Sequence, residues 1–304
     1  MFERFWQWLI PAAGVLLLLR ILQSRRLTRD WTIDYSLRWS ALAAGVIVVA
    51  NVPAFGFISA GPGWRGMLQY LVAILLLTPA ICTLGARRPG VGPWQWFVVL
   101  PMILVLLWPV VAQAADTSGR TPVYLSNPQL CGFCLAALMG LGPGLGTAAT
   151  AAVLLRLSAA LLALCPLRST GGWAETAARL VPLALLAESW VQQTLVEGHL
   201  QRLRQAGTDD QRSREIWLMF QTLYGSVWPR RVQDRMLQFQ QGERWTVTLA
   251  DTGFLRLDGQ PATDEELRKP LEAFRWLMGR FVSAGWLEKW LPERHDGQSG
   301  AAQA

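Results

Sequence analysis

Long uncharged stretches follow one another along the first half of the chain, separated by short segments that carry arginine. Four stretches contain no charged residue: 39–64, 66–86, 89–115 and 121–155. Each is longer than the roughly 20 helical residues that cross the hydrocarbon core of a bilayer. The core of a soluble domain does not need such stretches in succession. The pattern therefore predicts a multi-pass helical membrane domain over about the first 165 residues.

The first four spans can be placed approximately from this pattern. We expect them at about 5–23, 39–59, 67–85 and 94–113. The first span is followed by "RILQSRRLTR", which offers no small-x-small cleavage site. We therefore interpret it as a retained helix rather than a cleaved signal peptide.

The number of spans after residue 128 is open between two interpretations. Over 128–165 the chain can form a short helix, a Gly-Pro-Gly turn at 142–144 and a second helix to Cys165. Alternatively, one helix runs through to about Leu155, and Arg156 marks its cytoplasmic end. The apolar segment 180–196 is either a seventh span or an amphipathic helix in the membrane interface. The fold class is thus an all-α membrane domain of six or seven transmembrane helices.

The arginines of the short loops predict the orientation in the membrane. Arginines follow the first and third spans, whereas the alternate loops carry only Arg65 and Arg120. Because positively charged loops stay in the cytoplasm, the N-terminus is expected outside. A seven-span arrangement then places the C-terminus in the cytoplasm of a bacterial-type cell. The arginine-rich loops are those with Arg25, Arg26, Arg29, Arg87 and Arg88.

Composition and charge agree with a membrane protein and argue against a nucleic-acid partner. The chain is 52% hydrophobic and 16% charged, with 28 basic and 21 acidic residues. Residues 199–304 hold 15 basic and 14 acidic residues, so the positive excess lies in the apolar part. That distribution is a topology signal rather than the footprint of a nucleic-acid-binding surface.

The C-terminal part alternates helical and strand patterns and predicts a small soluble α+β module. Apolar positions at helical spacing predict two helices before residue 242. Alternation across an Asp-Thr-Gly turn predicts a β-hairpin over 245–249 and 254–257. A capping box at Thr263 and Glu266 opens a final helix. The module is therefore two helices, a β-hairpin and a helix.

These patterns divide the chain into four parts. We expect a transmembrane domain at 1–198, a basic linker at 199–210, the cytoplasmic module at 211–291 and a disordered tail at 292–304. A single core in a module of about 80 residues is only just sufficient for stability. We therefore expect the module to be stabilised by packing against the membrane or against a partner protein.

Two cysteines, Cys131 and Cys134, form a Cys-x-x-Cys that carries the one redox hypothesis. Asn127 is a candidate N-cap, which places Cys131 near the positive end of a helix, where the thiolate is stabilised. Membrane thiol–disulfide oxidoreductases need a second cysteine pair, and Cys82 and Cys165 are far apart in sequence. The alternative is a structural role, in which two small residues pack against a neighbouring helix.

Two charges inside apolar segments, Arg156 and Glu188, are candidates for a functional role. Ionisable residues within membrane helices often mark functional sites. The two can pair within the bundle, or Arg156 can bind an anionic headgroup. The simpler interpretation puts Arg156 at a helix end and Glu188 on a solvated face.

Arginines and tryptophans of the module are candidate contacts for anionic lipid or for a partner protein. They are Arg230, Arg231, Arg235, Trp286 and Trp290. The two tryptophans either belong to the module core or form an apolar edge. A winged-helix comparison is loose, and the acidic neighbours make a nucleic-acid partner unfavourable.

Motifs that would indicate an enzyme, a cofactor or a metal are missing from the sequence. The glycines at 140–146 have no preceding strand and no following lysine, so they do not form a phosphate-binding loop. The predicted spans contain no histidine, which disfavours a metal site. We therefore expect an inner-membrane protein with a non-enzymatic role as an interaction or assembly subunit. The competing hypothesis is a thiol–disulfide oxidoreductase built on Cys131 and Cys134.

Overall fold

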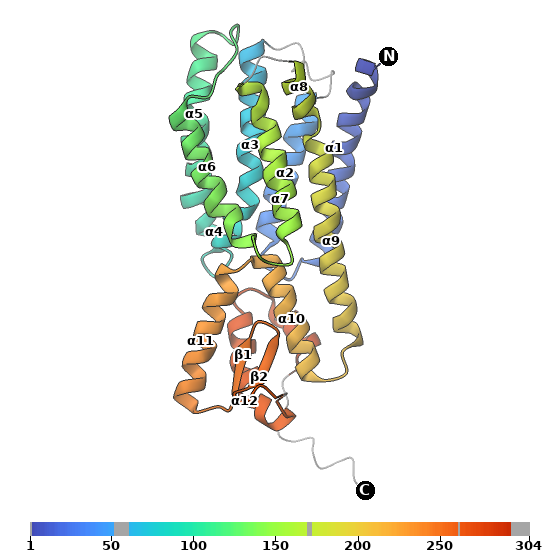
Figure 1. Ribbon diagram of the computed structural model, residues 1–304, viewed down its shortest axis with the longest axis vertical. Coiled ribbons are helices and arrows are strands. Elements are labelled where there is room, and N and C mark those ends of the chain that lie inside the picture. The colour runs from blue at the N-terminus through green and yellow to red at the C-terminus, as the bar shows by residue number, and fades with distance from the viewer. Residues whose placement is uncertain (1, 52–60, 169–171, 261, 293–304) are drawn as a thin grey trace.

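The computed structural model describes residues 2–51, 61–168, 172–260 and 262–292, and it is mostly helical (Figure 1). The predicted tail lies, from residue 293 on, outside the described residues. The N-terminal two thirds form a bundle whose helices run along the long axis of the molecule (Figure 1). The C-terminal third packs beneath one end of that bundle.

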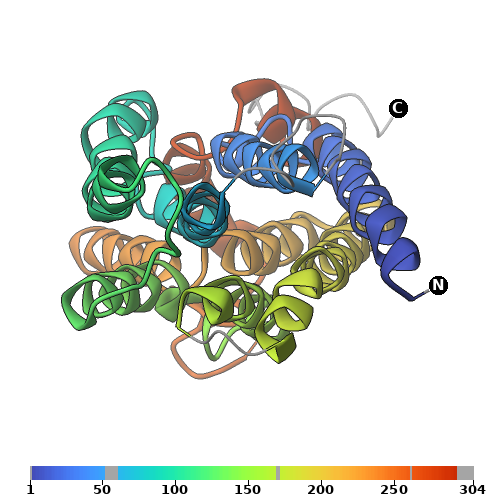
Figure 2. The same ribbon diagram turned by 90° about the horizontal axis from the view of Figure 1, so that it is seen from above.

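The bundle contains nine α-helices joined by short turns in its described part. Their bounds are α1 Phe2–Leu27, α2 Asp34–Asn51, α3 Pro62–Leu84, α4 Val91–Trp94, α5 Leu100–Asp116, α6 Asn127–Leu141, α7 Thr150–Leu164, α8 Gly172–Arg179 and α9 Val181–Gln205. A π-helical turn, Gln95–Val99, joins α4 and α5 into one rod. Figure 2 shows α3 in the middle of the bundle, and α3 is also the apolar helix with the largest buried share.

Among the described residues, four helical segments are long and apolar enough to cross a membrane: 8–27, 62–84, 91–116 and 150–167. They correspond to the predicted first, third and fourth spans and to the second half of the 128–165 region. The predicted second span, 39–59, overlaps α2, but α2 begins earlier, at Asp34. Residues 52–60 of that prediction lie outside the described part of the chain.

The region 128–165 adopts the helix–turn–helix arrangement, so the alternative of one helix through Leu155 is wrong. Helix α6 ends at Leu141, and Gly142–Gly144 forms a single 3₁₀ turn. Pro143 has no N–H to donate, so it removes one backbone hydrogen bond at this point. Gly146 has φ +78°, a left-handed conformation that glycine adopts without steric cost. The chain then re-enters a helix at Thr150.

Proline inside α3 is accommodated by two hydroxyl groups. Pro79 cannot donate to the carbonyl of Leu75, and the Thr78 hydroxyl donates to that oxygen instead at 2.7 Å. The Ser36 hydroxyl of α2 donates to the carbonyl oxygen of Pro79 at 2.8 Å. These bonds satisfy the backbone around the proline and hold α2 beside α3.

The C-terminal third contains four helices and one hairpin in its described part. Their bounds are α10 Asp209–Tyr224, α11 Val227–Glu243, β1 Val247–Ala250, β2 Gly253–Arg256, α12 Asp264–Met278 and α13 Ala284–Trp290. The strands pair antiparallel, with Val247 opposite Arg256 and Ala250 opposite Gly253. The predicted two-stranded sheet and the Thr263–Glu266 capping box are confirmed. The single predicted final helix is two helices, because Ser283 caps a second one, α13.

The C-terminal third is joined to three turns at the end of the bundle. Backbone N–H groups of Thr32 and Arg88 donate to the carbonyls of Phe281 and Arg280, and Ser226 N–H donates to Pro143. Gly225 makes the last contact possible, because a Cβ there would lie 2.7 Å from the Pro143 oxygen. These bonds place the turns at 28–33, 85–90 and 142–149 on one side of the molecule.

A hydrophobic cluster unites this third with the bundle ends. Trp31, between α1 and α2, packs with ring centroids 6.2 Å from Tyr224 and 5.1 Å from Trp286. The Tyr224 hydroxyl shares a 2.8 Å hydrogen bond with Thr32, and burial raises the pKa of Tyr224. The bundle also contributes these residues to the cluster: Ile33, Ala86, Val196, Leu200 and Leu203. The core of the C-terminal third is therefore completed by the bundle.

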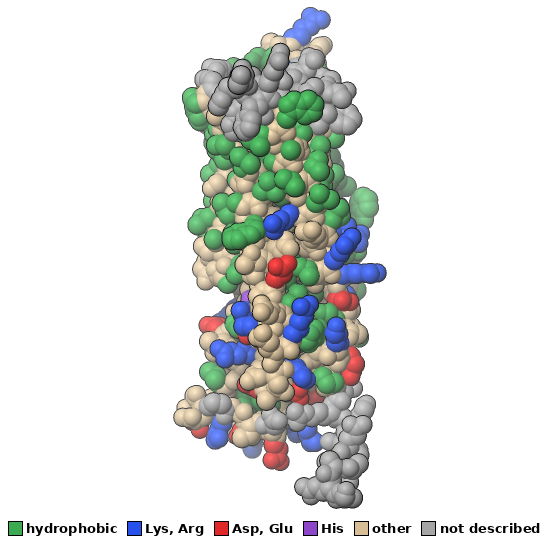
Figure 3. Space-filling view, turned by 90° about the vertical axis from the view of Figure 1, so that its right-hand side faces the viewer, with side chains coloured by type: hydrophobic (Ala, Val, Ile, Leu, Met, Phe, Trp, Pro, Cys, Tyr) green, Lys and Arg blue, Asp and Glu red, His purple; other side chains and the backbone are tan. Residues whose placement is uncertain are grey.

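The molecular surface changes from apolar to charged along the long axis of the molecule. Figure 3 shows hydrophobic side chains covering much of the upper part of one face, and charged side chains gathered lower down. Bundle helices expose large apolar side chains, among them Leu16, Leu19, Val105, Leu138 and Leu154. An apolar belt of this kind is what a bilayer covers in a membrane protein.

Candidate functional site

A buried ion pair between Arg156 of α7 and Glu188 of α9 is the strongest candidate site in the described chain. The Nη2 and Nε atoms of Arg156 lie 2.6 and 2.7 Å from Oε1 of Glu188. Glu188 is only 2% exposed. Burying either charge alone is costly, so the two charges depend on each other.

The positions of these two residues differ from the simpler sequence interpretation. Arg156 lies within α7, which runs from Thr150 to Leu164, and not at a helix end. Glu188 is buried and does not lie on a solvated face. Helices α7 and α9 pack side by side, and this brings together two residues that are 32 apart in sequence. The alternative of a pair within the bundle is the arrangement found.

Glutamine side chains extend the ion pair along α9. Gln192 donates its Nε2 hydrogen to the same Oε1 of Glu188 at 2.9 Å. Gln193, on the next position, accepts from Arg20 of α1 at 3.2 Å and donates to Glu197 at 2.7 Å. Polar contacts thus link α1, α7 and α9 through the middle of α9. Sequence reasoning missed both glutamines, because glutamine in an apolar segment gives no pattern that separates a ligand from a solvated residue.

A cavity of about 130 Å³ lies beside the ion pair, between the bundle and the C-terminal third. Arg156 and Glu188 are the charged residues of its described lining. The C-terminal end of α10, Thr222–Gly225, also lines it. Its polar lining also includes Ser24, Thr28, Ser36, Ser40, Thr83, Gln192 and Gln193. A concave, mainly apolar space with a few converging polar groups is the usual form of a small-molecule site.

One hydroxyl in the cavity wall, that of Ser40, is buried and has no hydrogen-bond partner among the described residues. Ser40 also lines a second, smaller cavity of about 30 Å³, which shares Arg156 and Glu188 with the first. The ion pair therefore lies at the junction of two cavities. Buried polar groups are nearly always hydrogen-bonded, so an unpaired hydroxyl facing a cavity points to a ligand or to water.

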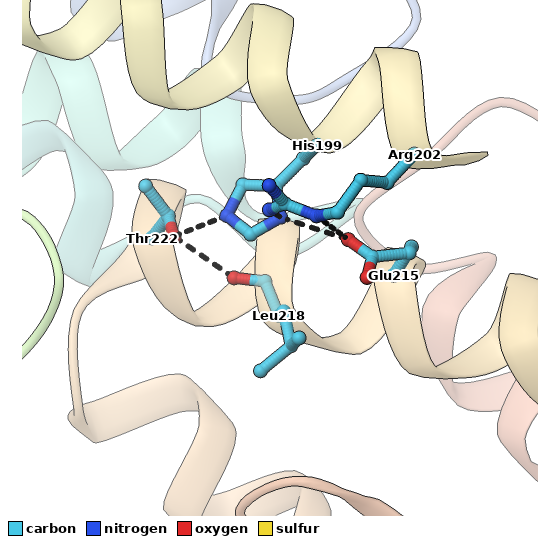
Figure 4. A network of polar contacts seen from close by, with 5 residues as sticks. All are labelled: His199, Arg202, Glu215, Leu218 and Thr222. Atoms are coloured by element: carbon cyan, nitrogen blue, oxygen red, sulfur yellow. Dashed lines mark hydrogen bonds and ion pairs between the residues drawn. The ribbon is translucent and has the colours of Figure 1, made fainter. Parts of the chain in front are cut away.

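A second polar network lies at the lower end of α9, where the helix runs beyond the bundle beside α10 (Figures 1 and 4). The Nη2 of Arg202 is 2.8 Å from Nδ1 of His199, and the Nε of Arg202 is 2.9 Å from Glu215. On the other side of the ring, Nε2 of His199 is 3.1 Å from the Thr222 hydroxyl. Thr222 also lines the cavity, so this network and the cavity are adjacent.

Both ring nitrogens of His199 have polar partners. The Thr222 hydroxyl donates to the carbonyl of Leu218 at 2.9 Å, so its oxygen can accept from the Nε2–H of His199. Nδ1 lies 2.8 Å from the Arg202 guanidinium and 3.2 Å from Oε2 of Glu215, so it can accept from the first or donate to the second. Burial lowers the pKa of His199 below its usual value, and the Arg202 charge acts in the same direction, against the opposing effect of Glu215. The imidazole is therefore neutral near pH 7.

The predicted cysteine pair lies on an exposed face of α6. Cys131 and Cys134 are both exposed and are not joined by a disulfide. Leu135 and Leu138 are also exposed, one turn further along the same face. The helix is capped by Ser126 in a capping box with Gln129, and not by Asn127 as expected. The apolar neighbours favour contact of this face with lipid.

The predicted contact residues of the module occupy different surroundings. Arg231 and Arg235 lie over the rings of Trp228 and Phe239, each 4.9 Å from the centroid. Arg230 is exposed and pairs with Asp234 at 3.4 Å. Trp286 is buried against Trp31 of the same chain, and Trp290 packs half-buried beside it. Trp286 thus packs the C-terminal third against the bundle, and Trp290 packs against Trp286.

The described residues contain no group of three His, Cys, Asp or Glu side chains placed to hold a metal ion. Comparisons with protein-family models, with curated proteins and with solved structures find no match for this chain. Function is therefore inferred from the chain's own residues.

We expect the variant Glu188→Leu to lose stability, because it leaves the Arg156 guanidinium buried without a counter-charge. Removing one partner of such a pair costs about 3–5 kcal/mol, whereas replacing both is nearly neutral. The double variant Arg156→Leu/Glu188→Leu should thus recover most of the loss. The thermal unfolding midpoint of the purified protein in lipid nanodiscs measures this. Arg204→Leu, exposed on the same helix, is the matched control. Equal midpoints for the single and double variants would contradict the dependence of one charge on the other.

We expect the His199 network to make stability dependent on pH. Because the pKa of His199 is lowered by folding, the unfolded chain binds more protons below its usual pKa of about 6.5. The stabilising contribution is therefore full above that value and declines as the pH falls through it. Thermal midpoints measured between about pH 5 and 8 should show a steeper acid-side decline for the wild type than for His199→Gln. Parallel profiles for the two proteins would rule out the assigned role of this histidine.

Proposed function

We propose that this protein is a multi-pass inner-membrane protein with seven spans, formed by α1, α2, α3, the α4–α5 rod, α6, α7 and the part of α9 up to about Val196. Its N-terminus lies outside the cell, and its C-terminal third lies in the cytoplasm. The four apolar segments support the membrane assignment. The other three spans are proposed because α2, α6 and α9 run beside those segments along the same axis (Figure 1).

The orientation is supported by where the arginines lie. Arg25 and Arg26 end α1, Arg87 and Arg88 follow α3, and Arg202 and Arg204 end α9. All three groups are at the end of the bundle that contacts α10–α13. Positively charged segments remain on the cytoplasmic side during insertion, so this end is assigned to the cytoplasm.

We further propose that the C-terminal third, 211–291, acts as a non-enzymatic interaction module that binds another protein. One observation carries this proposal: an exposed aromatic and cationic surface on α11 and α12. Trp276 is 53% exposed, with Phe239 6.1 Å away and Arg280 over its ring at 4.3 Å. Arg235 of α11 lies over the ring of Phe239. Exposed tryptophan and arginine are the residues that most often dominate protein interfaces.

The orientation is tested by labelling intact cells with a membrane-impermeant maleimide. Asp116→Cys and Gln201→Cys are made separately in a chain whose Cys131, Cys134 and Cys165 are serine. Both positions are exposed, at opposite ends of the bundle. Asp116→Cys should label in intact cells, and Gln201→Cys only after the membrane is opened. The reverse result would overturn the proposed orientation.

The same reagent tests the redox hypothesis, which stays a prediction. In the native chain, labelling of Cys131 and Cys134 is compared before and after reduction. Labelling that appears only after reduction would establish an oxidised pair and favour the oxidoreductase. Labelling that does not depend on reduction indicates two separate thiols, consistent with their apolar surroundings on α6.

The interaction role is tested by placing a photo-crosslinking amino acid at Trp276 in living cells. We expect a discrete cross-linked species there, and none with the same probe at the exposed control position Gln201. With the partner purified, Trp276→Ala should weaken binding about 30-fold, which corresponds to the ~2 kcal/mol of a central interface residue. An identical cross-linking pattern at both positions, or unchanged affinity, would refute this surface as the interface.

A further inference from the structure

The cavity beside Arg156 and Glu188 has a charge balance that limits what it can bind. The two charged residues of its described lining neutralise each other through contacts of 2.6 and 2.7 Å. A ligand with a net charge would add an uncompensated charge to a buried space, at a high cost in free energy. The cavity therefore fits a molecule without net charge.

The hydrogen-bonding groups that remain in the cavity wall are both donors and acceptors. Three donors, Nε and Nη2 of Arg156 and Nε2 of Gln192, converge on Oε1 of Glu188. Among the described residues Oε2 of Glu188 and Nη1 of Arg156 have no such partner. The Ser40 hydroxyl, which can donate and accept, is also unpaired. A hydroxyl or an amide on a ligand both donates and accepts, and so matches this set.

The rest of the wall is apolar and the volume is small. Leu27, Ile33, Leu37, Val153 and Leu223 contribute hydrocarbon to the lining. At about 130 Å³ the cavity is close to the size of an engineered protein cavity of about 150 Å³ that holds benzene. These walls suit a body about the size of one aromatic ring.

We propose that this cavity is a binding site for a small uncharged molecule that carries a hydroxyl or amide group on an apolar body. The polar group bonds to Ser40, to Oε2 of Glu188 and to the guanidinium of Arg156. The apolar body packs toward Val153 and Leu223. Because Thr222–Gly225 at the end of α10 line the cavity together with bundle residues, the bound molecule touches the bundle and the C-terminal third together. This site is independent of the proposed protein interface on α11 and α12.

The test uses four fluorinated probes that share one ring and differ in the attached group. They are 4-fluorobenzyl alcohol, 4-fluorotoluene, 4-fluorobenzoate and 4-fluorobenzylamine. Binding to the full-length chain in nanodiscs is followed by ¹⁹F NMR line broadening, with protein-free nanodiscs correcting for partition into lipid. We expect saturable binding of the alcohol, at least about tenfold tighter than that of the apolar, anionic and cationic probes.

Variants locate the binding in the cavity. Val153→Phe fills the space and should abolish saturable binding, whereas Leu154→Phe, on the outward face with 50% exposure, should leave it unchanged. Ser40→Ala removes one hydroxyl with little change in volume and should weaken alcohol binding about tenfold. It provides a second test if Val153→Phe does not fold.

Three results would overturn the proposal. The first is the absence of saturable binding by the alcohol in the wild type. The second is equal or tighter binding of the toluene or of a charged probe. The third is alcohol binding that neither Val153→Phe nor Ser40→Ala reduces, which would place the molecule in the lipid or elsewhere on the protein.

Discussion

The packing of Trp31 between Tyr224 and Trp286 is the contact on which the architecture depends. It joins the first turn of the bundle to the last helix of the chain, and it buries three large aromatic side chains at once. The C-terminal third supplies most of the buried cluster around this contact, including Trp217, Phe220 and Phe274. The ends of the bundle add further apolar surface to it, and the backbone bonds of Thr32, Arg88 and Ser226 fix the two parts in one orientation.

Because the two parts are held together in this way, α9 belongs to the bundle and also contacts the C-terminal third. Its middle part carries Glu188 and Gln192 inside the bundle, and its end carries His199 and Arg202 beside α10. A ligand in the cavity, the ion pair and the histidine network are thus all attached to one helix. Whatever alters the packing of α9 acts on the bundle and on the C-terminal third together, because a helix is stiff along its axis and its backbone bonds are internal.

Much of the local structure followed from the sequence. The uncharged stretches 66–86 and 89–115, the Asp-Thr-Gly turn between alternating strands and the Thr263–Glu266 capping box each depend on neighbouring residues alone, and each is present. The Gly-Pro-Gly turn is likewise local, and the left-handed Gly146 follows it. Boundaries were less well determined: α2 begins at Asp34 because that side chain is paired with Arg25 and Arg38, contacts that a hydropathy pattern does not contain.

The sequence identified two residues of the candidate site but not how they are arranged. Arg156 and Glu188 were recognised as charges in apolar segments, because burying a charge without a partner is unfavourable wherever it occurs. The sequence did not decide that they pair, since that depends on α7 and α9 lying side by side. The cavity, the unpaired Ser40 hydroxyl and the contacts of His199 exist only where several distant segments meet. Sequence determined which local elements form and that charges in them need partners; tertiary structure alone decided which partners they have, because hydrogen bonds and ion pairs act over a few ångströms and not along the chain.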